Sequence, residues 1–575
     1  MAEPSLQLGN GNWAGKSSNL LAYHKVVDNF YADELTFSRA SSGTIVNADG
    51  LIEQVPYNKL QQSNQFDTTW INQLSGTIVG GQSGYDGTDN AWKLSKSAAT
   101  FKSVRQVITT SGIQTLSAYL KADTLDKASF RIDTTSVIFV DFDLTNGTYY
   151  ISGGFPTSAN IQEVSNGWYR ADVTFNESIT NVHIYVDKSN ATSGSIFVQD
   201  AQLNSGSTAK TYYPTTTRLN VPRVDYLNNS NGSLLLEPQR TNSIPHNNDL
   251  NNFSTRSNVS IVSNTATSPD GTTNAHKLNT DTATSSHYIN QAATNSGVEN
   301  TISCFAKKGE YNYIQLASLS SVQQYANFDL NLGVVGTKGT RISSSKIEDY
   351  GNGWYRCVCV LNNVSSLNGA SFVISNSASA AWLPSFTGVV NEGIYLFGCQ
   401  LELTSSYPTS YIPTSGTTVT RLQDTSSTAG LSSVIGQTEG TMYIDFTYKG
   451  LEDVNNMTSL SDGGVSNRVQ LNISSSGIGA LIVSNGVTSF TSSNTSLVVG
   501  NRYKVAVKYK VNDFALWING TETSTDTLGD VPLNLNRFSF AFTNGTAFHF
   551  NQTVSASLLY KTALTNTELA TLTTL

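Results

Sequence analysis

The chain has 575 residues, of which 13% are charged, and its formal net charge at pH 7 is −8. This length is too great for one hydrophobic core and predicts three or four domains. No run of lysine and arginine could follow a phosphate backbone, which argues against nucleic acid as a partner. No apolar run is long enough to span a membrane and the N-terminus lacks a signal-peptide pattern, so we expect a soluble chain with no membrane insertion.

The residue usage favours β-strands throughout the chain. There are 26 tyrosines and 24 phenylalanines, which suit strands, beside many Ser, Thr and Asn residues, which suit strand surfaces and turns. Long amphipathic helical stretches are missing from the pattern. The predicted fold class is all-β, with tandem antiparallel β-sandwiches behind an N-terminal attachment segment.

The chain begins with residues 1–57, which we expect to form a lead-in segment that attaches the protein to a partner. A comparable linker, residues 215–241, contains the stretch SLLLEP from Ser233, which is too apolar to be left in water. We therefore expect both segments to pack between domains or against a partner subunit.

Residues 58–214 and 242–421 are two copies of one domain, called copy 1 and copy 2 from here on. SNGWYRADV from Ser165 returns as GNGWYRCVC from Gly351, and FDLTNG from Phe142 returns as FDLNLG from Phe328. Fixed-offset similarity of this kind is decisive for architecture. The offset grows toward the end of the repeat, so copy 2 carries an insertion, which we place near SASAAWLPSF from Ser377.

Each copy shows the pattern of an antiparallel jelly roll. Apolar and polar residues alternate from Leu116 to Lys121, as in a strand with one buried face. Asn-Gly pairs, such as Asn146 with Gly147, mark tight turns between such runs. Trp168 and Trp354 are expected to be packing anchors at the start of a strand.

Residues 422–575 do not follow the repeat and predict a third β-sandwich. The run NRYKVAVKYKV alternates from Tyr503 to Val511. Near the end, Thr565 and Glu568 have the spacing of a capping box, which predicts one short helix.

The cysteines are expected to fill the core of copy 2. Cys304, Cys357, Cys359 and Cys399 align with Ala118, Ala171, Val173 and Ala201 of copy 1. Because free cysteine behaves as a small buried hydrophobe, we favour this over a disulfide or a metal site.

We found no motif for catalysis, a cofactor or a metal. The six histidines are scattered without metal-ligand spacing, and no serine nucleophile has the required strand and helix around it. We expect a non-enzymatic protein. A carboxylate pair for glycoside hydrolysis is a less favoured alternative, because such a pair depends on geometry that spacing along strands does not reveal.

Sugar binding is the chemistry that the pattern favours, since sandwiches of this kind hold sugars by stacking them on aromatic rings. The glycan-binding candidates are Tyr119 and Phe305, which share one outward position in the two copies, and Trp92 and His276, which share another. Packing beneath a loop or a neighbouring domain is the alternative for all four. The loop YDGTDN from Tyr85 could hold a calcium ion, although a plain Asp-Gly turn explains it better.

Three sets of motifs resemble bacteriophage virion proteins of the tail-fibre or appendage type. They are TFSRASSGTIVNADGLIE from Thr36, PRVDY with SLLLEPQRTN from Pro222, and QLELTSSYPTSYIPTSGTTVTR from Gln400. Such proteins contain jelly rolls similar to carbohydrate-binding modules. FALWING from Phe514 and YKTALTNTELATL from Tyr560 resemble concanavalin-A-like, laminin-G-type domains. Fold-level likeness does not settle function.

The resemblance implies a tail fibre or similar appendage, exposed on the virion, that binds host surface glycans. The implied partners are other virion proteins, reached through residues 1–57, and further copies of the chain, since such fibres are often trimers. The alternatives are a purely structural head fibre, decoration or adaptor protein and, less favoured, a polysaccharide depolymerase.

Overall fold

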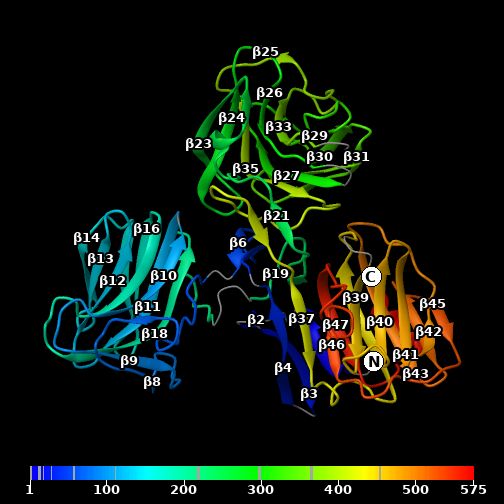
Figure 1. Cartoon of the computed structure of the whole chain (residues 1–575), viewed down its shortest axis with the longest axis horizontal. Coiled ribbons are helices and arrows are strands. Elements are labelled where there is room, and N and C mark those ends of the chain that lie inside the picture. The colour runs from blue at the N-terminus through cyan, green and yellow to red at the C-terminus, as the bar shows by residue number, and fades with distance from the viewer. Residues whose placement is uncertain are drawn as a thin grey trace. The chain divides into compact units, whose positions relative to one another are not determined.

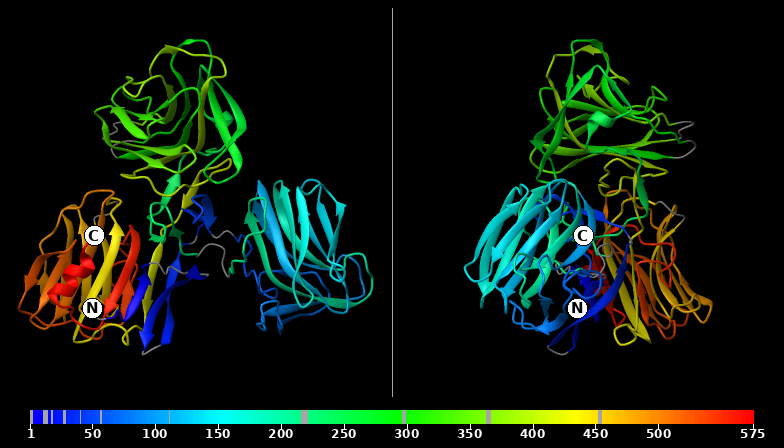
Figure 2. Two further views of the ribbon diagram at one scale, coloured as in Figure 1. Left: turned by 180° about the vertical axis from the view of Figure 1, so that it is seen from behind. Right: turned by 60° about the vertical axis from the view of Figure 1, so that its left-hand side comes forward.

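The computed structural model describes residues 3–10, 15–16, 19–26, 29–39, 41–55, 58–110, 112–215, 221–295, 299–362, 367–451 and 455–575. The chain divides into two compact units (Figures 1 and 2). Unit 1 is made of Met1–Gly15, Asn19–Glu53 and Pro222–Leu575, and unit 2 of Lys16–Ser18 and Gln54–Val221. Nearly all regular structure is β, which confirms the predicted fold class.

Copy 1 forms the sandwich of unit 2 from two six-stranded antiparallel sheets. The first sheet has the order β14 (Thr148–Gly153), β13 (Ile138–Asp143), β12 (Lys127–Asp133), β17 (Ile179–Val186), β10 (Ser103–Thr110), β7 (Ile71–Asn72). The second has the order β15 (Ser158–Ser165), β16 (Trp168–Asn176), β11 (Ile113–Ala122), β18 (Gly194–Ser205), β9 (Ala91–Lys96), β8 (Ile78–Gln82). In the predicted alternating run, Leu116, Ala118 and Leu120 belong to the core, as expected, and Tyr119 and Lys121 are half-buried. Ser117, expected on the wet face, is 1% exposed, so this face is partly covered as well.

Copy 2 repeats this arrangement within unit 1. One sheet contains β23 (Val259–Thr267), β24 (Thr273–Thr280), β35 (Gly393–Leu403), β27 (Asn300–Lys308), β32 (Trp354–Leu361) and β31 (Ile342–Asp349), with β21 (Arg240–Asn242) and β36 (Val419–Arg421) attached. The other contains β22 (Thr255–Ser257), β26 (His287–Gln291), β33 (Ala370–Ser375), β28 (Tyr313–Ala317), β29 (Tyr325–Asp329) and β30 (Val334–Lys338). A short pair, β25 (Thr284–Ser285) with β34 (Phe386–Thr387), and a 3-10 helix, η1 (Leu250–Asn252), complete it.

All four cysteines of copy 2 are free and fully buried, and they belong to its hydrophobic core. The core-filling interpretation is therefore confirmed. Burial raises the pKa of the Cys304 thiol, as expected for an inert core cysteine.

The C-terminal part of unit 1 is a closed, antiparallel network of strands around a main core, and a second, smaller hydrophobic cluster includes Trp517 and Leu569. From residue 425 onward it uses β37 (Thr425–Ala429), β38 (Glu439–Thr447), β39 (Asn455–Ser461), β40 (Arg468–Ser474), β41 (Gly477–Ser484), β42 (Val487–Thr491), β43 (Arg502–Lys510), β44 (Phe514–Ile518), β45 (Thr521–Asp526), β46 (Arg537–Ser539) and β47 (Thr553–Tyr560). The helix α1 (Asn566–Thr573) has the predicted capping box, in which Thr565 and Glu568 satisfy each other's backbone N–H groups.

The N-terminal segment and the linker contribute strands to this C-terminal part. They supply β1 (Leu6–Gly9), β2 (Gly15–Lys16), β3 (Asn19–Val26), β4 (Asn29–Ser38), β19 (Val224–Asp225) and β20 (Ser233–Leu235), whereas β5 (Gly43–Val46) and β6 (Ile52–Val55) form a separate hairpin. Both β1 and β20 pair with β47, so the blue and red ribbons lie side by side in Figure 1. The strands β1 to β4 of this segment are thus part of the strand network of the C-terminal part. Their attachment to a virion partner, and the domain boundaries, stay predictions.

A buried network of ion pairs joins the lead-in, the linker and the start of the C-terminal part. Asp424 accepts from Arg39 at 3.0 Å and from Arg223, while Glu237 pairs with Arg223 and Arg421, both at 2.8 Å. These side chains are at most 1% exposed. Although burial alone would raise it, the pKa of Glu237 lies well below its usual value, because Arg421 and Arg223 stabilise the carboxylate.

Candidate functional site

Tyr119, the first predicted glycan ligand, lies against another aromatic ring. Its ring stacks on that of Tyr85, with centroids 3.6 Å apart, and the guanidinium of Arg170 lies 5.5 Å from its centroid. The side chain is half-buried. Since Tyr85 and Arg170 both contact this ring, Tyr119 serves as a packing surface for the loop that carries Tyr85.

Phe305, at the same position in copy 2, is only 1% exposed, so its ring is covered, as in the packing alternative. Its ring belongs to a buried cluster with Trp354, Val46 and Ile52, the last two from the hairpin β5–β6. The sequence pattern identified the face of the strand correctly, but it could not show that another segment of the chain covers this face.

Trp92 and His276 have the same structural role in the two copies. The Trp92 indole N–H donates to the carbonyl of Asn64 at 2.9 Å, and His276 Nε2 makes a 2.6 Å hydrogen bond with the carbonyl of the aligned Asn248. Trp92 is half-buried and His276 is 3% exposed. A ring nitrogen bound to a backbone carbonyl holds the adjoining loop in place, which fits the packing alternative.

The loop YDGTDN is organised by its own turn bonds. Asp86 accepts from the backbone and the hydroxyl of Thr88, at 3.1 and 2.8 Å, and Asp270 does the same with Thr272 in copy 2. Within the described residues, no three His, Cys, Asp or Glu side chains are grouped so that they could hold a metal. The geometry is that of the Asp-Gly turn.

The structure shows a different set of exposed aromatic rings. Among the described residues, the aromatic side chains that are more than a third exposed are Phe101, Tyr149, Tyr150 and Phe155 of copy 1, together with Phe548 near the C-terminus. Tyr150 is 70% exposed and Phe155 88%. None of these five was among the predicted ligands.

One of these rings, Phe101, meets the less exposed rings of Phe139 and Tyr185 on the outer face of the first sheet of copy 1. Phe139 lies with its ring 6.5 Å from Phe101 and 5.9 Å from Tyr185, and the cations of Arg131 and Lys188 lie 5.5 and 5.3 Å from its centroid. We call this surface, which extends across β12, β13, β14 and β17, the copy 1 face. Its cation–π contacts position charged donors around a flat apolar patch.

Polar groups continue the copy 1 face toward its edge strand. Lys188 pairs with Asp141 at 2.8 Å, Ser129 donates to Asp141 at 2.6 Å, and Tyr150 stands opposite Asp141 in the register of β13 and β14. A depression of about 260 Å³ is lined by Ser129, Asp141 and Tyr150 together with Lys127. Exposed rings next to fixed hydrogen-bonding groups can hold a polyhydroxylated ligand such as a sugar.

An ionic cluster lies at the other side of the copy 1 face. Asp133 accepts from Arg131 at 2.5 Å and from His183 at 3.2 Å. Burial would raise the pKa of Asp133, but these two partners lower it below its usual value, while burial lowers the pKa of His183. The cluster keeps Arg131 in position beside Phe139.

The insertion in copy 2 covers the equivalent face there. Gln315 and Asn327, which align with Ser129 and Asp141, donate to the carbonyls of Ala381 and Ala380, at 2.9 and 2.7 Å. Gly336 aligns with Tyr150, and a Cβ at Gly336 would lie 2.2 Å from the carbonyl oxygen of Ala378. Copy 2 has no room for a ring at the position where copy 1 exposes one.

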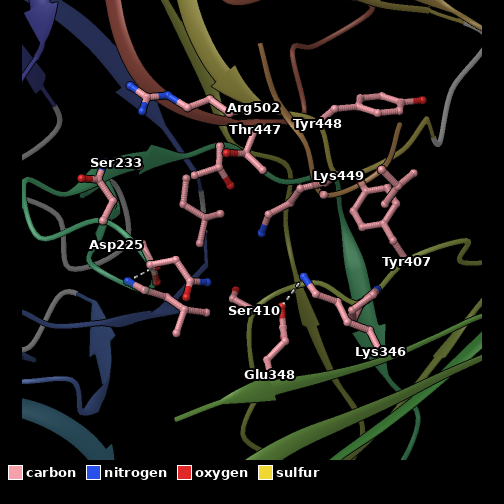
Figure 3. A pocket seen from close by; sticks show the side chains of 18 of the residues that line it. Asp225, Ser233, Lys346, Glu348, Tyr407, Ser410, Thr447, Tyr448, Lys449 and Arg502 are labelled. Atoms are coloured by element: carbon pink, nitrogen blue, oxygen red, sulfur yellow. Dashed lines mark hydrogen bonds and ion pairs between the residues drawn. The ribbon is translucent and has the colours of Figure 1, made fainter. Parts of the chain in front are cut away.

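A larger cavity, of about 410 Å³, lies within unit 1 (Figure 3). Its lining includes Asp225 from the linker, Lys346 and Glu348 from copy 2, and Lys449 and Arg502 from the C-terminal part. Lys346 pairs with Glu348 at 2.8 Å. No spacing in the sequence indicated this cavity, because its residues come from distant segments.

No protein-family model matches this sequence, and no curated protein matches it. The similar solved structures include carbohydrate-binding modules. A CBM40 of the Ruminococcus gnavus IT-sialidase, bound to α2,3-sialyllactose, is 16% identical over 25% of this chain and 86% of its own, with a TM-score of 0.22. The tandem CBM22 domain of Paenibacillus barcinonensis Xyn10C is 11% identical over 63% of this chain and 98% of its own, with a TM-score of 0.20.

A third similar structure is domain 4 of AbnA, an extracellular arabinanase from Geobacillus stearothermophilus, in complex with arabinotriose. It is 15% identical over 30% of this chain and 91% of its own, with a TM-score of 0.21. With TM-scores this low, these matches indicate neither a ligand nor an activity for this chain. Among the described residues, no helix is long and apolar enough to cross a membrane.

Proposed function

We propose that this protein is a non-enzymatic structural protein of a bacteriophage virion, an appendage of the tail-fibre type that binds host surface glycans. The virion assignment rests on the sequence motifs, and glycan binding rests on the copy 1 face. There, Phe101, Phe139 and Tyr150 adjoin the fixed polar groups of Asp141 and Lys188. The proposal includes a homo-oligomer such as a trimer. Weak single sites on linked copies would then bind more tightly together than one site alone, because linkage raises the effective concentration.

Glycan binding is tested with the purified full-length protein on host cells and on a glycan array. We expect Tyr150→Ala and Phe139→Ala each to weaken binding about tenfold, the equivalent of about 1.4 kcal/mol. The control is Phe548→Ala, which removes an exposed ring outside copy 1. If the wild-type protein binds no glycan, or if all three variants bind equally well, the glycan proposal is wrong.

The virion assignment is tested by immunogold electron microscopy with an antibody against residues 422–575. Gold at the fibre tips or the tail would support an adhesive appendage. Gold over the head would favour the head-fibre, decoration or adaptor alternative, and unlabelled particles would contradict the assignment.

The non-enzymatic part is tested by incubating the protein with host capsule polysaccharide and measuring new reducing ends. We expect none above the buffer control. Shortening of the polymer would support the depolymerase alternative.

A further inference from the structure

The cavity within unit 1 has the features of a binding site that is separate from the copy 1 face. It is about 410 Å³ in volume, within the range of cavities that bind small molecules. In Figure 3 the ammonium groups of Lys449 and Lys346 point toward the same space, with Asp225 and Glu348 at its sides. Arg356 also belongs to the lining.

The two carboxylates of this inner lining are already engaged by the protein. Asp225 accepts from the backbone N–H groups of Val46 and Leu227, at 2.7 and 3.0 Å. Glu348 is paired with Lys346 at 2.8 Å. Neither carboxylate therefore needs a ligand to satisfy it.

The cations are less completely satisfied than the carboxylates. Within the part of the chain that the structure describes, the ion-pair partner of Lys449 is Glu237, 3.6 Å away, which is beyond hydrogen-bond distance. The Nε of Arg356 is buried and has no hydrogen-bond partner among the described residues, although its Nη2 donates to Ser303 and to Thr409. Arg356 itself is 5% exposed. A buried guanidinium N–H without an acceptor is costly. The aligned Arg170 of copy 1 also has an Nε without a partner among the described residues, so the open position that is particular to this cavity is the ammonium of Lys449.

The lining has four cations, Lys346, Lys449, Arg356 and Arg502, and two carboxylates, Asp225 and Glu348, which are both occupied. Outside the lining, Asp445 pairs with Arg502, and Glu237 lies 3.6 Å from Lys449. The residues of the lining therefore carry more positive than negative charge and more hydrogen-bond donors than acceptors. Arginine and lysine form their strongest hydrogen bonds with anionic oxygens. The hydroxyl of Thr447 in the lining suits a hydroxyl group of the same ligand. The Ser410 hydroxyl is already bonded to Glu237, Arg223 and Arg421.

We propose that this cavity is a second saccharide site and that it binds an acidic sugar, with the carboxylate of a hexuronic acid directed toward Lys449 and Arg356. The choice of a saccharide rests on the proposed function, whereas the choice of an acidic one rests on the lining. The two sites would bind sugars by different interactions, since the copy 1 face offers aromatic rings and this cavity offers cations.

The test is isothermal titration of the full-length protein with trigalacturonic acid, with neutral cellotriose as the matched sugar. We expect trigalacturonic acid to bind and cellotriose to bind at least tenfold more weakly. Lys449→Gln combined with Lys346→Gln should weaken the acidic sugar at least tenfold. Lys504→Gln is the control, because this lysine donates to the carbonyl of Thr574 and is not part of the lining.

A second measurement keeps the test independent of how the variants fold. Raising the ionic strength from 0.05 to 0.5 M should weaken binding of trigalacturonic acid to the wild-type protein several-fold, because salt screens the attraction of charges. Binding that is unchanged by salt, or equal for the double variant and Lys504→Gln, would overturn the proposal. So would the absence of any trigalacturonic acid binding.

The two proposals fail in distinguishable ways. Tyr150→Ala should leave trigalacturonic acid binding unchanged, since Tyr150 lies in unit 2 and the cavity in unit 1. Loss of this binding in Tyr150→Ala would mean that the acidic sugar occupies the copy 1 face, and the cavity proposal would be wrong while the glycan proposal stood.

Discussion

The first sheet of copy 1 and the matching sheet of copy 2 have the same strand order but very different outer faces. In copy 1, Tyr150 and Phe101 are 70% and 58% exposed. In copy 2, the aligned surface is covered by the insertion, whose backbone carbonyls accept hydrogen bonds from Gln315 and Asn327. A duplicated sandwich can therefore keep its core while an insertion in one loop covers a face in one copy and leaves it open in the other.

The opposite sheets differ at one backbone position. Copy 1 has Asp200 and copy 2 has Gly398 at the same bulge, and both have a positive φ, of 56° and 59°. A carboxylate with this backbone is strained, whereas glycine adopts it freely. Asp200 accepts a hydrogen bond from the Tyr85 hydroxyl at 3.0 Å. In copy 1 the strained residue therefore anchors the loop that covers Tyr119.

The largest effect is expected from breaking the buried ion network, which lies in unit 1. Asp424→Ala would leave Arg39 and Arg223 without their shared carboxylate in a fully buried site. We expect unit 1 to lose about 3–5 kcal/mol of unfolding free energy and unit 2 to lose none. Hydrogen exchange followed peptide by peptide would measure the two units separately. Asp141→Ala, which breaks the partly exposed pair with Lys188, is the matched control and should cost at most about 1 kcal/mol.

The contribution of Asp200 to the stability of unit 2 and that of Glu237 to the stability of unit 1 should change with pH in opposite directions. Burial raises the pKa of Asp200 to about 7, so folded unit 2 binds more protons than the unfolded chain between about pH 4 and pH 7. Its stability should fall as the pH rises through this window, by about 2–4 kcal/mol, and level off above it. Asp200→Asn should remove this fall.

The carboxylate of Glu237 contributes in the other direction, because its folded pKa is depressed. Its stabilisation of unit 1 is present above the unfolded pKa, about 4.3, and is lost as the pH falls below it. Exchange rates measured from pH 3 to 8, corrected for intrinsic exchange, would show both trends. Parallel trends in the two units would contradict this account.

Substitutions at the aligned edge positions Gly336 and Tyr150 should show, by their different losses of stability, that one face is covered and the other open. Gly336→Ala would bring a Cβ to within 2.2 Å of the Ala378 carbonyl oxygen. We expect a loss of about 1–3 kcal/mol in copy 2, as for other overpacked sites. Tyr150→Gly, at an exposed position of copy 1, should cost at most about 1 kcal/mol. Thermal unfolding gives both values, and equal losses would show that the two faces are equally covered.

The smallest effect is expected from Gly398→Ala. At this φ of 59°, a Cβ would lie 2.9 Å from the ring of Tyr411 and 3.0 Å from that of Phe305. These rings can shift by a few tenths of an ångström, so we expect a loss of about 1–2 kcal/mol by urea unfolding. Gly81→Ala, which also has a positive φ but nothing within 4 Å of its Cβ, separates the backbone strain from the contact with the rings.

Much of the fold could be predicted because it depends on local pattern. Alternation at Leu116–Lys121 indicated a strand, the aligned cysteines indicated a core, and Thr565 with Glu568 indicated the start of a helix. The candidate site was predicted less well. Phe305 and His276 were expected outward, but other segments bury them. The rings of Phe101 and Tyr150 gave no distinguishing signal, because an exposed and a buried aromatic look alike in one sequence.

The sequence by itself determined the all-β class, the duplication, the insertion in copy 2 and the short C-terminal helix, since each follows from periodicity or from spacing along the chain. Only the tertiary structure decided that β1 pairs with β47, that Asp424 meets Arg39 and Arg223, and that the insertion covers one copy and leaves the other open. The physical reason is that strand period and turn chemistry depend on residues that are close in the sequence. Burial depends instead on which distant segment packs against a face.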